Sequence, residues 1–121
     1  MFDHLSIPVT DYEASKRFYE AVLASLGHTL IMEHPISGGG FGSGGKPSFW
    51  IKQGEPSSRV HVAFATSSRA LVDEFHATAI AAGAPSNGAP GLRPEYHPTY
   101  YGAFVLDPDG NNLEAVCHLA E

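Results

Sequence analysis

The chain has 121 residues, 43% of them hydrophobic and 17% charged, and a formal net charge of −6. These values fit one soluble globular domain, and an acidic chain without a Lys/Arg cluster argues against a nucleic-acid partner or an anionic membrane surface. A lone Cys117 rules out an internal disulfide, no apolar run reaches membrane-spanning length, and the N-terminus lacks a signal core. We therefore expect a cytoplasmic protein.

The first quarter of the chain predicts a strand followed by a helix. Residues 2–9 alternate between apolar and polar side chains, and Pro8 puts this strand at a sheet edge or at its own end. Thr10 and Glu13 fit a capping box, which predicts a helix ending near Gly27. Its inward face is expected to carry Ala14, Phe18, Ala21, Val22 and Ser25.

A glycine-rich segment, residues 37–45, lies between expected strands at 28–33 and 49–53. It matches G-x-G-x-x-G and nearly spells a P-loop. However, Pro47 stands where a P-loop requires Ser or Thr, and a strand pattern follows where both motifs require a helix. We interpret the segment as a thin strand or hairpin whose missing side chains leave room over a pocket.

The second half repeats the order of the first. A polar linker over residues 54–58 is followed by an alternating strand at 60–66 and an amphipathic helix at 69–82. His4 in the first strand recurs as His61 in the second. Because the elements and their caps recur in the same phase, the sequence indicates an internal duplication.

The C-terminal segment predicts a hairpin. Residues 84–98, rich in Gly and Pro, are expected to be a loop leading into a short strand. Residues 102–116 then form a β-hairpin around the turn Asp107-Pro108-Asp109-Gly110. On its second strand the small apolar side chains share one face, and Glu114 lies on the other.

Each half therefore reads as a strand, a helix and about three more strands. This is an α+β pattern with helices packed on one face of a sheet. We predict one domain, residues 1–121, made of two modules at about 1–55 and 58–121.

Three polar residues could meet if the two modules stack side by side. His4 and His61 occupy equivalent places opposite their apolar rows, and Glu114 projects from the last strand. Two imidazoles and a carboxylate are the ligands of a facial triad, which leaves positions open for substrate or water. The same pattern also fits three solvated side chains, so both interpretations stay open. We call His4, His61 and Glu114 the candidate triad.

Three stretches together resemble the vicinal oxygen chelate superfamily: residues 3–11, residues 61–64 and residues 104–115. This superfamily includes glyoxalase I, extradiol dioxygenases, fosfomycin-resistance transferases and bleomycin-resistance proteins. The resemblance implies paired βαβββ modules that form a concave sheet with helices outside, usually in a homodimer with exchanged modules. It also implies a divalent metal ion (Fe, Mn, Ni or Zn) held by the candidate triad.

The chain departs from particular branches of that superfamily. Glyoxalase I has a fourth, acidic ligand in the last strand of its first half, whereas residues 49–53 contain no carboxylate, which argues against lactoylglutathione lyase activity. Ser6 could supply the hydroxyl that fosfomycin-resistance enzymes place two residues after the first histidine. Phe104 stands where those enzymes have a tyrosine.

The sequence favours a metal-dependent enzyme, a lyase, dioxygenase or transferase, that chelates two oxygens of a small substrate and acts as a Lewis acid. In an exchanged dimer, we expect His4 from one chain and His61 and Glu114 from the other. The alternative is a metal-free protein of the bleomycin-resistance type that sequesters a small molecule in an aromatic groove, with Phe49, Trp50, Tyr100 and Tyr101 as its walls. The predicted substrate contacts are Ser6, Trp50, Arg93, His97 and Tyr101.

Overall fold

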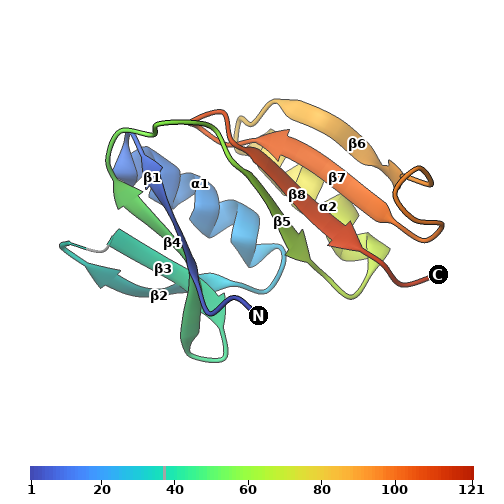
Figure 1. The fold of residues 1–121 in the computed structure, drawn as a ribbon, viewed down its shortest axis with the longest axis horizontal. Helices are drawn as coiled ribbons and strands as arrows, with labels where there is room; N and C mark the ends of the chain where they lie inside the picture. The colour runs from blue at the N-terminus through green and yellow to red at the C-terminus, as the bar shows by residue number, and fades with distance from the viewer. Residues whose placement is uncertain (37) are drawn as a thin grey trace. The chain divides into compact units, whose positions relative to one another are not determined.

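The computed structural model describes residues 1–36 and 38–121, which form two compact units, Met1–Ser58 and Arg59–Glu121. In the described residues each unit has one helix and a four-stranded mixed sheet, connected in the order strand, helix, strand, strand, strand (Figure 1). The predicted α+β pattern of two βαβββ modules is therefore confirmed. Ser37, the first residue of the glycine-rich segment, lies outside the described residues.

The first unit has the sheet order β1-β4-β3-β2, in which β1 runs parallel to β4 and the other pairs are antiparallel. Its elements are β1 (Leu5–Val9), α1 (Tyr12–Ala24), β2 (Thr29–His34), β3 (Gly38–Ser43) and β4 (Lys46–Gln53). Pro8 lies in the edge strand β1, so its lack of a backbone N–H does not cost the sheet an interior hydrogen bond. The sequence allowed either a sheet edge or the end of a strand at Pro8, and the structure shows a sheet edge.

The cap of α1 differs from the predicted capping box by one residue. Asp11, not Thr10, is the N-cap, and its carboxylate accepts a hydrogen bond from the backbone N–H of Ala14 at 3.1 Å. Aspartate caps at least as well as threonine, so the helix begins one position later. Of the predicted inward residues, Phe18 and Val22 are buried, Ala14 and Ser25 are half-buried, and Ala21 is exposed.

The glycine-rich segment forms strand β3, and β4 follows it, so the structure has no helix N-terminus there to bind phosphate. The absence of a side chain at Gly40 makes room for an indole ring. A Cβ added at Gly40 would lie 2.8 Å from Cζ2 of Trp50 and 2.8 Å from Cβ of Pro47. The segment is a strand over Gly38–Ser43, as interpreted, but the room left at Gly40 is filled by the side chains of Trp50 and Pro47 rather than open over a pocket.

The second unit repeats the topology with the order β5-β8-β7-β6, and β5 runs parallel to β8. Its elements are β5 (His61–Ala65), α2 (Arg69–Ala81), β6 (Ser86–Leu92), β7 (Tyr101–Leu106) and β8 (Asn112–Cys117). Helix α2 packs against β6, β7 and β8, and its buried side chains are Val72, Phe75 and Ala79. Neither helix of the described chain has the length and apolar character needed to cross a membrane.

The C-terminal hairpin forms as predicted, but the segment before it does not. Residues 84–98 were expected to be mainly loop, whereas β6 occupies Ser86–Leu92 and pairs with β7. Its register shifts at two places, so the strand shows none of the alternation by which strands are recognised in a sequence. In the hairpin turn, Asp107 accepts hydrogen bonds from the backbone N–H groups of Asp109 and Asn111 at 2.9 and 2.8 Å.

Candidate functional site

The second unit holds a buried carboxylate on the face of its sheet opposite α2. Glu114 is in the middle of β8, its side chain is 1% exposed, and both of its oxygens accept hydrogen bonds. Nε2 of His61 lies 2.9 Å from Oε1, and the hydroxyl of Tyr100 donates to Oε2. A buried charge persists only where such partners compensate for lost hydration, so this cluster is a site built around a carboxylate.

Tyr100 is the partner of Glu114 that sequence reasoning missed, because it was considered only as an aromatic wall. Burial, and then the hydrogen bond to Glu114, raise the pKa of Tyr100 to about 12. The phenol therefore stays protonated and acts as a donor at neutral pH. The ring of Tyr100 also contacts His118, with 5.1 Å between ring centroids.

Strand register explains why Tyr100, rather than Tyr101, reaches the carboxylate. Phe104 pairs directly with Glu114, so residues 100, 102 and 104 share its face. Gly102 leaves the path open: a Cβ there would lie 3.1 Å from Oε2 of Glu114 and 3.2 Å from Cε1 of Tyr100. Counting residues back from the hairpin turn, together with that glycine, could have identified Tyr100.

Two other predicted substrate contacts, Arg93 and Tyr101, lie on opposite faces of the sheet in this unit. Arg93 stacks on Phe104, with 5.4 Å from its guanidinium carbon to the ring centroid, and Phe104 in turn contacts the ring of His61. Arg93 therefore lies on the face that carries Glu114. Tyr101 instead faces α2, because its hydroxyl donates to Asp73 at 2.6 Å.

The hydrogen bond to Asp73 also raises the pKa of Tyr101. His97 lies between β6 and β7, where its Nδ1 accepts a hydrogen bond from the backbone N–H of Thr99 at 3.2 Å. Its ring centroid lies 6.2 Å from that of His118.

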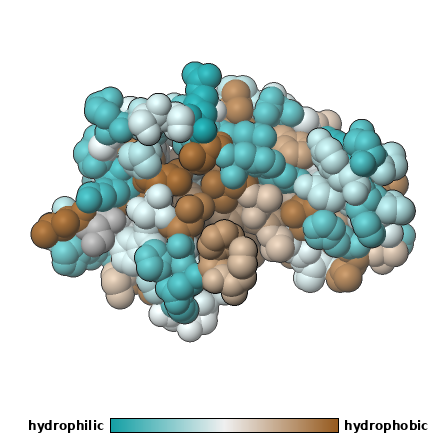
Figure 2. All heavy atoms as spheres, viewed as in Figure 1, coloured by the Kyte–Doolittle hydropathy of each residue, from teal (hydrophilic) through white to brown (hydrophobic). Residues whose placement is uncertain are grey.

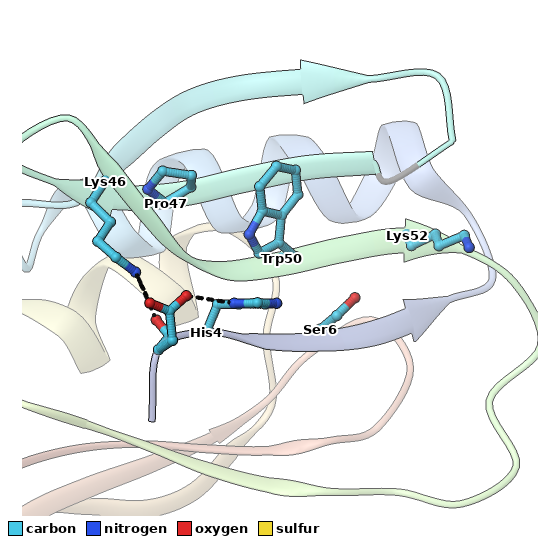
Figure 3. A pocket seen from close by; sticks show the side chains of 7 residues that line it. His4, Ser6, Lys46, Pro47, Trp50 and Lys52 are labelled. Carbon is cyan, nitrogen blue, oxygen red and sulfur yellow. Dashed lines mark hydrogen bonds and ion pairs between the residues drawn. The ribbon is translucent and has the colours of Figure 1, made fainter. Parts of the chain in front are cut away.

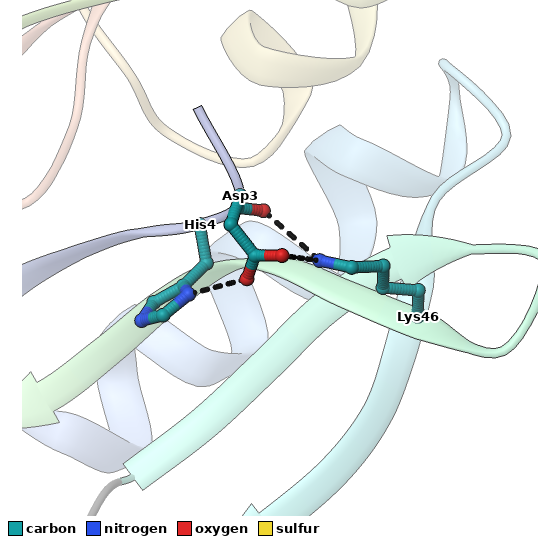
Figure 4. Close-up of polar contacts among 3 residues, drawn as sticks. All are labelled: Asp3, His4 and Lys46. Carbon is teal, nitrogen blue, oxygen red and sulfur yellow. Dashed lines mark hydrogen bonds and ion pairs between the residues drawn. The ribbon is translucent and has the colours of Figure 1, made fainter. Parts of the chain in front are cut away.

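The first unit carries an exposed chain of charged groups just before β1. The carboxylate of Asp3 bridges Nδ1 of His4 at 2.7 Å and Nζ of Lys46 at 2.9 Å (Figure 4). Both hydrogen bonds lower the pKa of Asp3, and the one from His4 has the larger effect. A carboxylate on Nδ1 favours the tautomer of His4 in which Nε2 carries a lone pair.

A pocket of about 510 Å³ opens beside His4 in the same unit. It lies along β1 and β4, and Figure 3 shows Trp50 and Ser6 beside it. Ser6 pairs directly with Trp50 across the parallel strands, so both predicted contacts share one face. We call it the Trp50 pocket, and its lining is Asp3, His4, Ser6, Lys46, Pro47, Trp50 and Lys52.

The chemistry of these groups fits a divalent metal. An imidazole nitrogen and a carboxylate oxygen are both common ligands of such ions, and Nε2 of His61 and Oε1 of Glu114 lie 2.9 Å apart, within hydrogen-bond distance. His4 has the carboxylate partner typical of metal-binding histidines. Within either unit, the described residues contain no group of three or more His, Cys, Asp or Glu side chains arranged to hold an ion.

Comparison with known proteins agrees with this architecture. The model of the Glyoxalase/Bleomycin resistance protein/Dioxygenase superfamily matches residues 1–115. A glyoxalase/bleomycin resistance protein from Albidiferax ferrireducens T118 is 31% identical, with a TM-score of 0.81 over 97% of this chain and 98% of that one. The chain therefore belongs to the Glyoxalase/Bleomycin resistance protein/Dioxygenase superfamily.

Two further solved structures share the fold. One, a glyoxalase/bleomycin resistance protein/dioxygenase family enzyme from Burkholderia phytofirmans PsJN, is 26% identical, with a TM-score of 0.74 over 97% of this chain and 98% of that one. The other, a lactoylglutathione lyase from Agrobacterium tumefaciens, is 18% identical, with a TM-score of 0.69 over 96% and 91% of the two chains. The comparison with curated proteins gave no match.

Proposed function

We propose that the protein is a metal-dependent enzyme of the glyoxalase type that acts on a small oxygenated substrate. In this proposal the candidate triad holds one divalent ion, Fe, Mn, Ni or Zn. The observation that carries it is the buried carboxylate of Glu114, which lies 2.9 Å from Nε2 of His61, so that two of the proposed ligands are already side by side. Family membership supports the same assignment.

A bound divalent ion would supply Lewis-acid polarisation of two neighbouring substrate oxygens. The chain's own residues hold the ligand atoms in place: Tyr100 fixes the rotamer of Glu114 through Oε2, and Asp3 orients the ring of His4. Second-shell partners of this kind tune metal affinity by about 10–100-fold. Isomerisation, ring cleavage and group transfer are all compatible with this arrangement.

The test is the metal content of the purified protein and its affinity for added Mn²⁺ or Zn²⁺. His61→Ala removes one proposed ligand, and we expect it to abolish stoichiometric binding. His76→Ala is the matched control, since His76 is a histidine of α2 in the same unit whose Nε2 contacts the hydroxyl of Ser86 at 2.8 Å. Full metal occupancy in His61→Ala would contradict the assignment.

We also propose a homodimer with exchanged modules, in which His4 comes from one chain and His61 and Glu114 from the other. Exposed apolar side chains support an association, and brown patches are visible on the face drawn in Figure 2. The large apolar residues more than a third exposed are Met1, Phe2, Leu5, Met32, Ile36, Val60, Ile80, Leu92, Tyr96 and Leu119.

A mixing experiment tests where the ligands come from. His4→Ala and His61→Ala chains are unfolded together, refolded and separated as a heterodimer. If each site draws His4 from the partner chain, one site per heterodimer keeps all three ligands, and one metal ion binds. If the three ligands come from one chain, no site is complete. A monomer in sedimentation equilibrium would contradict the dimer itself.

The alternative is a metal-free protein that sequesters a small molecule. The indole of Trp50 in the lining of the Trp50 pocket favours this reading, although Phe49, Tyr100 and Tyr101 do not line that pocket. Wild-type protein that takes up no divalent ion but binds an aromatic compound would support sequestration and contradict the enzyme. The single glyoxalase-like domain and the cytoplasmic location stay predictions.

A further inference from the structure

The Trp50 pocket combines an aromatic wall with one uncompensated positive charge. Trp50 and Lys52 are two residues apart on β4, so their side chains leave the same face of the sheet about 6.8 Å apart along the strand. Figure 3 shows Ser6 on the neighbouring strand β1, between Trp50 and Lys52, with the Lys52 side chain extending along β4. A flat ring and a nearby cation together suit a ligand that carries both an aromatic group and an anion.

The remaining charges of the pocket cancel one another. Asp3 and Lys46 form an ion pair at 2.9 Å, and Lys46 also donates to the backbone carbonyl of Asp3 at 3.1 Å. Lys52 has no carboxylate partner among the described residues. In a chain with a net charge of −6, this pocket is therefore locally positive, and it attracts an anion that the rest of the surface repels.

We propose that the Trp50 pocket binds a small aromatic carboxylate, with its ring against Trp50 and its carboxylate on Lys52. A single free ammonium matches a singly charged group such as a carboxylate. The pocket volume of about 510 Å³ is within the range of small-molecule sites. The hydroxyl of Ser6, opposite Trp50 in the strand register, is placed to bond a second oxygen of the ligand.

This inference names the substrate class of the proposed enzyme, and it rests on the proposed function in that His4, a proposed metal ligand, lines the same pocket. The two can nevertheless fail separately. If EDTA-treated protein binds the carboxylate but the wild type takes up no metal, the pocket stands and the metal enzyme falls. If the protein takes up metal but binds no aromatic carboxylate, the pocket assignment falls alone.

Trp50 is the only tryptophan of the sequence, so one indole N–H signal in a ¹H–¹⁵N spectrum reports directly on the pocket. The probes are benzoylformate, mandelate and phenylpyruvate, each titrated into EDTA-treated protein, with the neutral amide of benzoylformate as the charge control. We expect at least one carboxylate to shift the indole signal saturably and the amide to bind at least about threefold more weakly, because it forms no ion pair with Lys52.

The matched variants are Lys52→Met, Lys52→Arg and Lys16→Gln. Lys52 is exposed, so its substitution leaves the core intact. We expect Lys52→Met to weaken carboxylate binding at least about threefold and Lys52→Arg to retain it. Lys16→Gln removes the same charge at a site that pairs with Glu33 at 3.0 Å, and it should bind like the wild type.

Three results would overturn the assignment. The first is that none of the three carboxylates shifts the indole signal saturably. The second is equal affinity for benzoylformate and its amide, and the third is unchanged carboxylate binding by Lys52→Met.

Discussion

The two units share one topology but place different chemistry at equivalent positions. In the second unit, Glu114 pairs with Ala63 on one side and Phe104 on the other. In the first, the corresponding position of β4 is Trp50, which pairs with Ser6 and Gly40. The second unit thus pairs the carboxylate of Glu114 with the ring of Phe104, whereas the first unit pairs the ring of Trp50 with Gly40.

The difference extends to burial. Glu114 is 1% exposed and has both oxygens hydrogen-bonded, whereas Asp3, the carboxylate that lines the Trp50 pocket, is 70% exposed and lies before the first strand. The duplicated scaffold therefore gives one unit a buried carboxyl group, which we propose as a metal ligand. The other unit has an open pocket with an indole wall, which we propose as a site for an organic ligand. Because Trp50 occupies the strand position of Glu114, the first unit offers no equivalent carboxylate ligand from β4, consistent with a site of three ligands.

The largest effect we predict comes from removing the partner of the buried carboxylate. Tyr100→Phe deletes the hydroxyl that donates to Oε2 of Glu114 and leaves that oxygen buried without this donor. We expect a loss of about 2 kcal/mol in the free energy of unfolding, measured by urea denaturation of metal-free protein. Tyr96→Phe is the control: Tyr96 is 64% exposed, and its ring packs on Tyr100. Equal stability of the two variants would show that Tyr100 does not hold the carboxylate.

The sequence predicted much of this arrangement because strand periodicity determines which side chains share a face. Glu114 and His61 were assigned to the non-helix faces from alternation alone, and their hydrogen bond follows from that placement. Tyr100 was missed because it lies one residue before β7 begins, outside the hairpin predicted over residues 102–116. Tyr101, chosen as a substrate contact, faces α2 because its register partner is Cys117, on the apolar row of β8.

Other features depended on tertiary context. The strand β6 contains two glycines and a proline and shifts register twice, so local propensity argued for a loop. Pairing with β7 outweighs that propensity. Charge pairs such as Asp3 with Lys46 join distant parts of the chain, and no spacing rule predicts them. Trp50 and Ser6 were predicted as contacts from the sequence, whereas the cationic side of the pocket, Lys46 and Lys52, emerged only from the structure.

A smaller effect is expected where the first unit makes room for its ring. Gly40→Ala places a Cβ 2.8 Å from both Trp50 and Pro47, so the indole must shift, at a cost of about 1 kcal/mol in the free energy of unfolding. The indole N–H signal should move as well. Gly54→Ala is the control, because its Cβ would lie an ordinary 3.6 Å from Pro8. An unmoved indole signal in Gly40→Ala would mean that Trp50 does not lie over β3.

The smallest effect concerns a second carboxylate of the first unit, one far less buried than Glu114. The hydroxyl of Tyr12, at 2.7 Å, and then the ammonium of Lys16, at 3.0 Å, lower the pKa of Glu33 below its usual 4.5. A lowered folded-state pKa means that the ionised form is favoured by folding. The stabilisation is therefore complete above pH 4.5 and is lost as the pH falls through the lowered pKa.

Titration of the Glu33 side-chain carbon by NMR measures this directly. In Tyr12→Phe the largest cause of the shift is gone, so the pKa of Glu33 should rise toward 4.5. Lys16→Gln should raise it less, since the hydrogen bond from Lys16 is the second cause. If Lys16→Gln raised the pKa more than Tyr12→Phe, charge rather than the phenol hydrogen bond would control this exposed carboxylate. Glu33 and Glu114 would then differ in what controls them as well as in exposure, because a tyrosine hydroxyl holds the buried Glu114.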